Sequence, residues 1–228
     1  MRKTGPRRDL MERELIERAA EIFAERGFAN TTLQDIADAA QVGRTTLYHY
    51  FKSKDEFLTA LVEDVTIQSL KRLRAVRAQT DISPSERLRE AVLTHVAWLL
   101  TRPNRFKVLV RDEHTLPPEI RRRHEGAKRD VLAEFTGFIQ AGMDAGEFRD
   151  GNPRVIALSL IGMCNWSVWW YTPKGSMTRE QIGEMMADMA VRAVRRAEPL
   201  NGARTAKSAL REIRTSLAEL ERLIESER

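Results

Sequence analysis

The sequence has few cysteines, no signal-like segment and no long apolar run. Its 228 residues include one cysteine, Cys164, which excludes a disulfide framework and a cysteine-based zinc site. Twelve glycines and eight prolines are too few for a collagen-like or low-complexity chain. The most apolar stretch, residues 155–171, is interrupted by polar side chains and is shorter than the ~20 apolar residues of a membrane span. We therefore expect a cytoplasmic protein with no membrane partner.

The chain does contain many charges and enough apolar residues for a core. Lys and Arg total 38 against 33 Asp and Glu, a net charge of +5, and 42% of the residues are hydrophobic. This excess permits an anionic partner but does not require one. Basic residues concentrate in the leader, residues 1–8, and at Arg44, Lys52 and Lys54. The leader is compatible with contacts to a DNA backbone or minor groove and, equally, with a solvated tail.

Apolar residues recur at helical spacing along almost the whole chain, and no stretch alternates long enough to predict a strand. The pattern predicts an all-α fold of about ten helices. Their approximate ranges are 9–26, 33–40, 44–50, 54–79, 84–101, 104–114, 118–145, 153–171, 179–197 and 203–226.

Helix-start and helix-stop signals support these boundaries. Capping boxes are predicted where a serine or threonine precedes a glutamate or glutamine by three residues, at Ser53, Ser83 and Thr178, with a looser version at Thr32. Gly27 is expected to end the first helix in a left-handed conformation, which turns the next residue back toward the core.

Two short helices, 33–40 and 44–50, are joined by a brief turn, which is typical of a helix-turn-helix. With Leu47 facing inward, the second helix presents hydrogen-bonding side chains that suit base edges or phosphates. These candidates are Arg44, Thr45, Thr46, Tyr48, His49 and Tyr50. Thr32 at a helix start, Lys52 and Lys54 are placed to meet phosphates.

The stretch from Leu10 to Leu61 resembles the DNA-binding domain of TetR-family transcriptional regulators. The resemblance rests on A-x-x-x-F at 19–23, RGF at 26–28, TT-x-x-DIA at 31–37 and TLYHYFKSKDE-x-L at 46–58. It implies an all-helical homodimer with one recognition helix in each subunit. It also implies DNA contacts by Thr32, Gln34, Arg44, Thr45, Tyr48, His49, Tyr50 and Lys54.

The turn of the helix-turn-helix departs from the family pattern. Gln41 stands where the family usually has glycine, and Gly43 stands where a serine-like cap is common. A non-glycine residue in a left-handed conformation costs about 1 kcal/mol. The turn and the pose of Arg44 are therefore the least predictable part of the head.

The larger C-terminal part is expected to hold an effector pocket and a dimer surface. Large apolar side chains, including a tryptophan cluster, are candidate pocket walls, although each is also compatible with plain core packing. With two polar candidates for specificity, His114 and Asn165, the predicted set is Trp98, Phe106, Val110, His114, Phe135, Phe138, Ile139, Asn165, Trp166, Trp169 and Trp170. His95 is interpreted as an ordinary helix-face histidine and His124, among arginines, as solvated.

A second resemblance concerns residues 165–183 and 110–117. The tryptophan-rich helix followed by W-Y-x-P-x-G, and the acidic VRDEHTLP segment, are similar to TetR-family regulators of lipid or steroid breakdown. Several of those proteins respond to acyl-CoA thioesters, so the resemblance implies a largely apolar effector, with acyl-CoA thioesters as the candidate class. The family's dimer interface corresponds to helices 153–171 and 179–197.

These observations predict a DNA-binding domain at 1–53, a ligand-binding and dimerisation domain at 54–200 and an extra amphipathic helix at 201–228. The leading hypothesis is a repressor that binds a pseudo-palindromic operator in double-stranded DNA as a homodimer and is released by a small apolar ligand. The alternative is a DNA-binding regulator that is gated by a protein partner through the C-terminal helix. An enzyme is not expected, because we find no nucleophile–base pair, phosphate loop, cofactor motif or metal spacing.

Overall fold

The computed structural model describes residues 6–196 and, further on, residues 210, 211, 214, 215 and 217. The described elements are α1 (Pro6–Arg26), α2 (Leu33–Ala39), α3 (Arg44–Tyr50), α4 (Lys54–Val62), the π-helical turn η1 (Glu63–Ile67), α5 (Gln68–Arg77), α6 (Pro84–Thr101), α7 (Pro103–Arg111), the 3-10 turn η2 (Glu113–Thr115), α8 (Pro118–Asp144), α9 (Pro153–Trp170) and α10 (Arg179–Val194). Over these residues the all-α prediction is confirmed, with only an isolated bridge between Phe148 and Arg195. Most of the predicted helix 203–226 lies outside the described residues.

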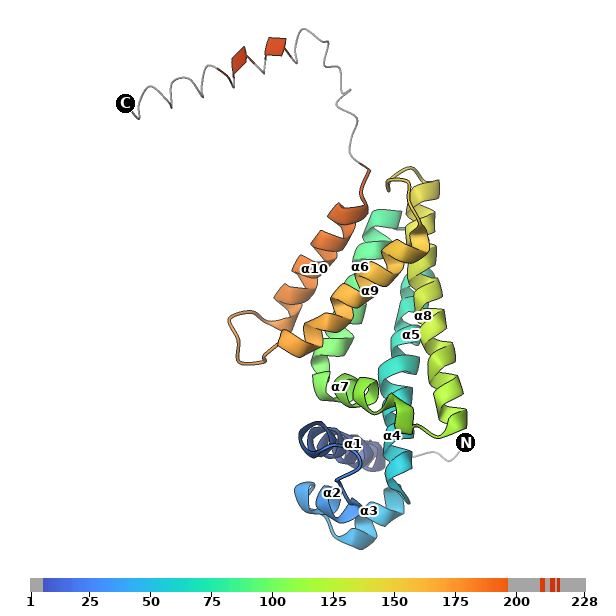
Figure 1. Ribbon diagram of the computed structural model, residues 1–228, viewed down its shortest axis with the longest axis vertical. Coiled ribbons are helices and arrows are strands. Elements are labelled where there is room, and N and C mark those ends of the chain that lie inside the picture. Colours follow the sequence, from blue (N-terminus) through green and yellow to red (C-terminus); the bar gives the residue numbers. More distant parts are fainter. Residues whose placement is uncertain (1–5, 197–209, 212–213, 216, 218–228) are drawn as a thin grey trace, which may run out of the picture. The chain divides into compact units, whose positions relative to one another are not determined.

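Helices α1, α2 and α3 lie together at one end of the unit formed by residues 6–195, and α4 leads from them into the body (Figure 1). In the body, α5, α6 and α8 run roughly along the long axis, α9 and α10 lie obliquely to it, and α7 lies between head and body. Among the described residues, none of the helices has the length and apolarity needed to cross a membrane.

The head is built around a small aromatic core. Phe23, Phe51 and Phe57 are buried, and the rings of Phe51 and Phe57 stack with centroids 3.9 Å apart. Gly27 ends α1 with φ +87°, and Phe28 turns back onto Phe23 with ring centroids 5.1 Å apart. The predicted glycine stop is therefore confirmed, because only glycine adopts this φ without a steric cost.

The predicted capping boxes are confirmed at three helix starts and wrong at one. Thr32, Ser83 and Thr178 each form the complete box. The Ser53 side chain makes no capping hydrogen bond. Its expected partner, Glu56, instead accepts from the backbone N–H of Lys52 at 2.7 Å, one residue before the cap. The local pattern identified the helix start, but it did not specify which amide the carboxylate binds.

The predicted continuous helix 54–79 is also corrected. The turn η1 separates α4 from α5, and the Gln68 N–H donates to the Glu63 carbonyl, five residues earlier. Such a π turn adds one residue to the helix and is common at functional positions. Val65 and Thr66 of this turn are buried.

Buried apolar residues form two clusters. One joins α1–α4 and η1 to Val108, Leu109 and Leu116 of the α7–η2 region. The other fills the body between α5, α6, α8, α9 and α10. The partly buried Phe106 packs against both clusters. Helix α7 is therefore the structural connection between head and body, together with α4.

Candidate nucleic-acid interface and effector pocket

Helix α3 presents a polar face to solvent and one apolar anchor to the head. Leu47 is fully buried, whereas Arg44, Thr45, Thr46 and His49 are exposed. Leucine at the middle of so short a helix holds it against α2, and the residues on either side then point outward. The face consists of a guanidinium, two hydroxyls and an imidazole, which together donate to and accept from base edges and phosphates.

The two predicted tyrosines of α3 are half-buried and linked to basic groups. Arg44 Nη2 donates to Tyr48 Oη at 3.3 Å, and the guanidinium lies 5.4 Å from the Tyr48 ring centroid. The Tyr50 ring packs edge-on to the His49 ring and lies 5.7 Å from the Arg8 guanidinium. The contact with Tyr48 thus orients the Arg44 side chain on the exposed face of α3.

The other residues predicted to contact DNA differ in their exposure and in the hydrogen bonds that they already make within the protein. Thr32 and Gln34 are exposed, but Thr32 is bound to Asp35 in the capping box and Gln34 Nε2 donates to Asp38 at 2.7 Å. Lys52 is exposed and donates to the Tyr48 carbonyl at 2.6 Å. Lys54 is half-buried and donates to the Phe28 carbonyl at 2.8 Å. Lys54 therefore also has a structural role, closing the α1–α2 loop onto α4.

Gln41, the departure in the helix-turn-helix turn, has φ +54°. Because a side chain is strained there, Gln41→Gly should raise the free energy of unfolding by about 1 kcal/mol. Chemical denaturation measures this change. As a control, Gln140→Gly in the interior of α8 should lower the free energy of unfolding by about 1 kcal/mol. A loss of stability in both variants would contradict the strain interpretation.

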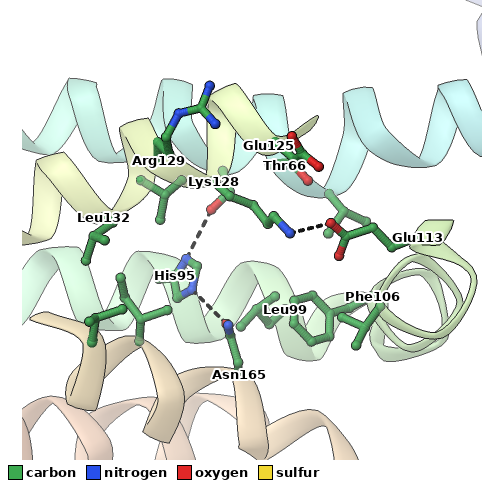
Figure 2. A pocket seen from close by; sticks show the side chains of 16 residues that line it. Thr66, His95, Leu99, Phe106, Glu113, Glu125, Lys128, Arg129, Leu132 and Asn165 are labelled. Carbon is green, nitrogen blue, oxygen red and sulfur yellow. Dashed lines mark hydrogen bonds and ion pairs between the residues drawn. The ribbon is translucent and has the colours of Figure 1, made fainter. Parts of the chain in front are cut away.

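The body contains a cavity of about 490 Å³ between the helices. Side chains of η1, α5, α6, α7, η2, α8 and α9 line it, as Figure 2 shows. They are Val65, Thr66, Ser69, His95, Leu99, Phe106, Val110, Glu113, Glu125, Lys128, Arg129, Val131, Leu132, Leu158, Ile161 and Asn165. Its volume lies in the range of small-molecule sites in proteins.

Three of the predicted pocket residues, Phe106, Val110 and Asn165, line this cavity. Trp98 lies beside it and lines two neighbouring hollows toward the head, with its indole N–H donating to the Val65 carbonyl at 3.4 Å. Its indole also packs under the Arg72 guanidinium at 4.0 Å.

The remaining predicted pocket residues lie elsewhere. Phe135, Phe138 and Ile139 are buried in the body core, and His114 is exposed on η2. The tryptophans of α9, Trp166, Trp169 and Trp170, are 66%, 46% and 52% exposed and are not among the lining residues.

Two buried histidines supply polar chemistry that the sequence interpretation missed. His95, predicted as an ordinary helix-face residue, is 5% exposed and lines the cavity. Its Nδ1 lies 3.0 Å from Ser69 Oγ, and its Nε2 lies 3.3 Å from Asn165 Oδ1. The sequence does place His95 at helical spacing with the apolar residues Val92, Val96 and Leu99, which indicates an inward-facing position. It does not show that Ser69 and Asn165 are the hydrogen-bond partners of His95.

The prediction that His124 is solvated is wrong. His124 is 4% exposed, and its Nδ1 lies 2.9 Å from Thr66 Oγ1 of η1. Burial lowers the pKa of His124, and the nearby Lys128 lowers it further. Lys128 in turn pairs with Glu113 at 2.5 Å, at the edge of the cavity (Figure 2). Of the arginines that precede His124, Arg122 and Arg123 are exposed, and Arg123 pairs with Glu63 of η1 at 2.6 Å.

His95 is expected to make the protein less stable below neutral pH. Burial lowers the pKa of His95 to about 4, from an ordinary value of 6.5. Between these values the unfolded chain binds more protons, so the contribution is complete above pH 6.5 and declines as the pH falls toward 4. We expect a loss of about 2 kcal/mol in the free energy of unfolding between pH 7 and pH 5.

Urea denaturation at each pH measures this loss. His95→Gln should flatten the profile over the same interval, which separates His95 from His124. An equally steep profile in the variant would assign the pH dependence to another group.

The chemistry of the cavity suits binding rather than catalysis. Although Ser69, His95 and Asn165 are connected, an imidazole with a pKa of about 4 is a weak base for activating a hydroxyl. Burial raises the pKa of the Cys164 thiol to about 12, so its reactive thiolate form is suppressed.

Two regions of the chain match known protein families. Residues 15–61 match "Bacterial regulatory proteins, tetR family", and residues 81–194 match "Tetracyclin repressor-like, C-terminal domain". The transcriptional repressor KstR2 of Mycobacterium tuberculosis is 32% identical over 181 residues, covering 75% of this chain and 86% of the relative. The fatty acid metabolism regulator of Bacillus subtilis is 25% identical over 148 residues, covering 65% and 76% of the two chains.

Solved structures give the same assignment. The ketosteroid regulator KstR2 of Mycobacterium tuberculosis superimposes with a TM-score of 0.74 at 26% identity, covering 82% of this chain and 95% of that one. AibR, solved in complex with isovaleryl coenzyme A and operator DNA, superimposes with a TM-score of 0.65 at 29% identity, covering 78% and 97%. The chain belongs to the TetR family of DNA-binding transcriptional repressors and is not an enzyme.

Proposed function

We propose that this protein is a cytoplasmic repressor that binds a pseudo-palindromic operator as a homodimer and is released when an acyl-CoA thioester enters the body cavity. The observation that carries the proposal is the combination of an exposed recognition helix with a separate, largely apolar cavity of about 490 Å³. The head of residues 1–53 reads DNA, and the body of residues 54–200 binds the ligand and the second subunit.

The acyl-CoA class is supported by the cavity and by one neighbour. Leu99, Phe106 and Leu132 form an apolar interior suited to an acyl chain. Lys128 and Arg129 also line the cavity; Lys128 is paired with Glu113, whereas Arg129 has no ion-pair partner within the part of the chain that the structure describes. Such cations suit the phosphates of coenzyme A. AibR, which resembles this chain in fold, is the neighbour solved with isovaleryl coenzyme A.

A dimer surface is supported by exposed apolar side chains on α9 and α10. Leu158, Gly162 and Trp166 follow one another at four-residue spacing on the exposed side of α9. Met185 and Met189 of α10 are 55% and 56% exposed, also four residues apart. Large apolar patches of this kind mark interaction surfaces, and two copies of this helix pair would bury one another's patch.

The turn η1 supports a connection between the cavity and the DNA. Thr66 lines the cavity, whereas Asp64 of the same turn accepts from Arg105 Nη1 at 2.6 Å. Arg105 also binds Glu17 of α1 at 2.7 Å. A ligand that displaces η1 therefore acts on a residue that contacts the head. Release then follows if the ligand binds better to the conformation in which the two heads are wrongly spaced.

The DNA part of the proposal predicts a specific loss of affinity. Arg44→Ala should weaken binding to the operator about 10- to 100-fold, because a guanidinium that contacts base edges is worth about 1–3 kcal/mol. Fluorescence anisotropy with DNA from upstream of the coding sequence measures this at fixed salt. Arg122→Ala, which removes an exposed arginine of α8, is the matched control and should change affinity less than twofold.

The ligand part is tested in the same assay. A medium-chain acyl-CoA should lower the operator affinity of the wild-type protein at least tenfold, and free coenzyme A should not. Equal binding to all DNA sequences, or no response to acyl-CoA in the full chain, would contradict the corresponding half of the proposal. A response that instead requires residues 201–228 and a protein partner would support the alternative hypothesis.

A further inference from the structure

Asn165 is a polar residue in an otherwise apolar wall of the cavity. It lies on α9 within the most apolar stretch of the chain and lines the cavity together with Ile161 of the same helix. Figure 2 shows Asn165 beside His95, with Leu99 and Phe106 close by. Asn165 is half-buried at this wall, and its amide can both donate and accept hydrogen bonds.

The contacts of His95 determine which end of the amide is already used. Nε2 of His95 lies 3.3 Å from Asn165 Oδ1, and with the amide in this orientation the ring proton is on Nε2 and is donated to Oδ1. Nδ1 is then an acceptor and receives the Ser69 hydroxyl proton at 3.0 Å. Burial keeps this ring neutral by lowering the pKa of His95 to about 4. The carbonyl oxygen of Asn165 is thus occupied, and its orientation is set from α5 through α6.

The amide nitrogen of Asn165 has no hydrogen-bond partner among the residues that the structure describes. The Ser69–His95–Asn165 chain therefore holds an NH₂ donor at the wall of an apolar cavity. A ligand that fills the cavity gains most if it places an acceptor there.

We propose that Asn165 is a specificity-determining residue that donates a hydrogen bond from Nδ2 to a carbonyl oxygen in, or next to, the apolar part of the effector. His95 and Ser69 are positioning residues that act through Asn165. This inference rests on the proposed function only in requiring that the cavity binds an effector. It adds that the effector is recognised by its carbonyl group and not by its apolar chain alone.

The test uses two pairs of ligands that differ only in the carbonyl group. One pair is 2-decanone and decane, and the other is decanoyl-CoA and its thioether analogue S-decyl-CoA. Displacement of a fluorescent apolar probe from the full-length protein measures the affinities. For each pair that binds, the wild-type protein should have about tenfold higher affinity for the compound with the carbonyl group.

Two variants remove the donor in different ways. Asn165→Leu keeps the size of the side chain, and Asn165→Asp keeps its shape and the oxygen toward His95. Both should reduce the preference to less than twofold, and at least one must retain the wild-type circular dichroism for the comparison. His95→Phe should also reduce the preference, because it removes the group that orients the amide. Leu132→Ala, a control in the apolar wall, should weaken both members of a pair and leave their ratio unchanged.

The outcomes separate this inference from the acyl-CoA proposal. A ketone preference that depends on Asn165, without binding of either CoA compound, would support the inference and overturn the acyl-CoA assignment. Binding of decanoyl-CoA and S-decyl-CoA with equal affinity would support coenzyme A recognition and overturn the inference. A carbonyl preference that persists in both Asn165 variants, or failure of all four compounds to bind, would also overturn it.

Discussion

Replacing Gly142 by alanine is expected to lower the free energy of unfolding by about 3 kcal/mol. Gly142 lies in the last turns of α8, and a Cβ atom added to it would lie 2.0 Å from a ring carbon of Phe148. Phe148 is 1% exposed, and its N–H donates to the Gly142 carbonyl at 3.0 Å. Because the ring is enclosed by the body core and its own backbone is tied to Gly142, it has no free direction in which to move.

Gly137→Ala in the same helix is the matched control for Gly142→Ala. A Cβ at Gly137 would meet no atom within 4 Å, so this variant should be more stable than the wild type by up to about 1 kcal/mol. Thermal and urea denaturation of the two variants measure the contrast. Similar changes in both would show that helix propensity, and not the contact with Phe148, governs this part of α8.

The second large effect is expected from Arg105→Ala, with a loss of about 3 kcal/mol in the free energy of unfolding. Arg105 is 3% exposed and binds Glu17 of α1 at 2.7 Å and Asp64 of η1 at 2.6 Å. It also donates to the backbone carbonyl of Arg13 at 3.4 Å. Truncation leaves two partly buried carboxylates facing each other without their common cation, which costs more than the loss of a surface ion pair.

Arg18→Ala provides the comparison for Arg105→Ala. Arg18 pairs with Glu14 and Glu21 on the solvent-facing side of α1, with its side chain 41% exposed. Its removal should cost far less than the removal of Arg105, because exposed ion pairs contribute little. Combining Arg105→Ala with Glu17→Gln should recover part of the loss, since one of the unpaired charges is then gone. A loss of the same size in Arg18→Ala and Arg105→Ala would contradict the buried-network interpretation.

Local sequence signals predicted the head well. The glycine stop at Gly27, the capping box at Thr32 and the inward-facing Leu47 each depend on residues only a few positions apart. Interactions of this range are set by backbone geometry, so a sequence read in short windows contains them. The exception is Ser53, where two competing local partners for Glu56 were both within reach.

The cavity was predicted less well, because its polar contacts join distant parts of the chain. Thr66 and His124 are 58 residues apart, and Ser69 and His95 are 26 residues apart. The π turn η1, which places Thr66 and Val65 at the cavity, also has no local signal that distinguishes it from a continued α-helix. The tryptophans of α9 were predicted as pocket walls from their density alone, whereas their exposure places them on the outer surface of the helix.

The amino-acid sequence by itself determined the helical class, the helix-turn-helix and the family, because apolar spacing, caps and a contiguous motif are local properties. Only the tertiary structure decided that Gly142 is needed for close packing, whereas Gly137 faces open space. It also decided that His95 and His124 are buried, and that one arginine of α7 connects the head to η1. The physical reason is that burial and ion pairing depend on which helix faces meet, and these faces are brought together by long-range packing of the apolar core.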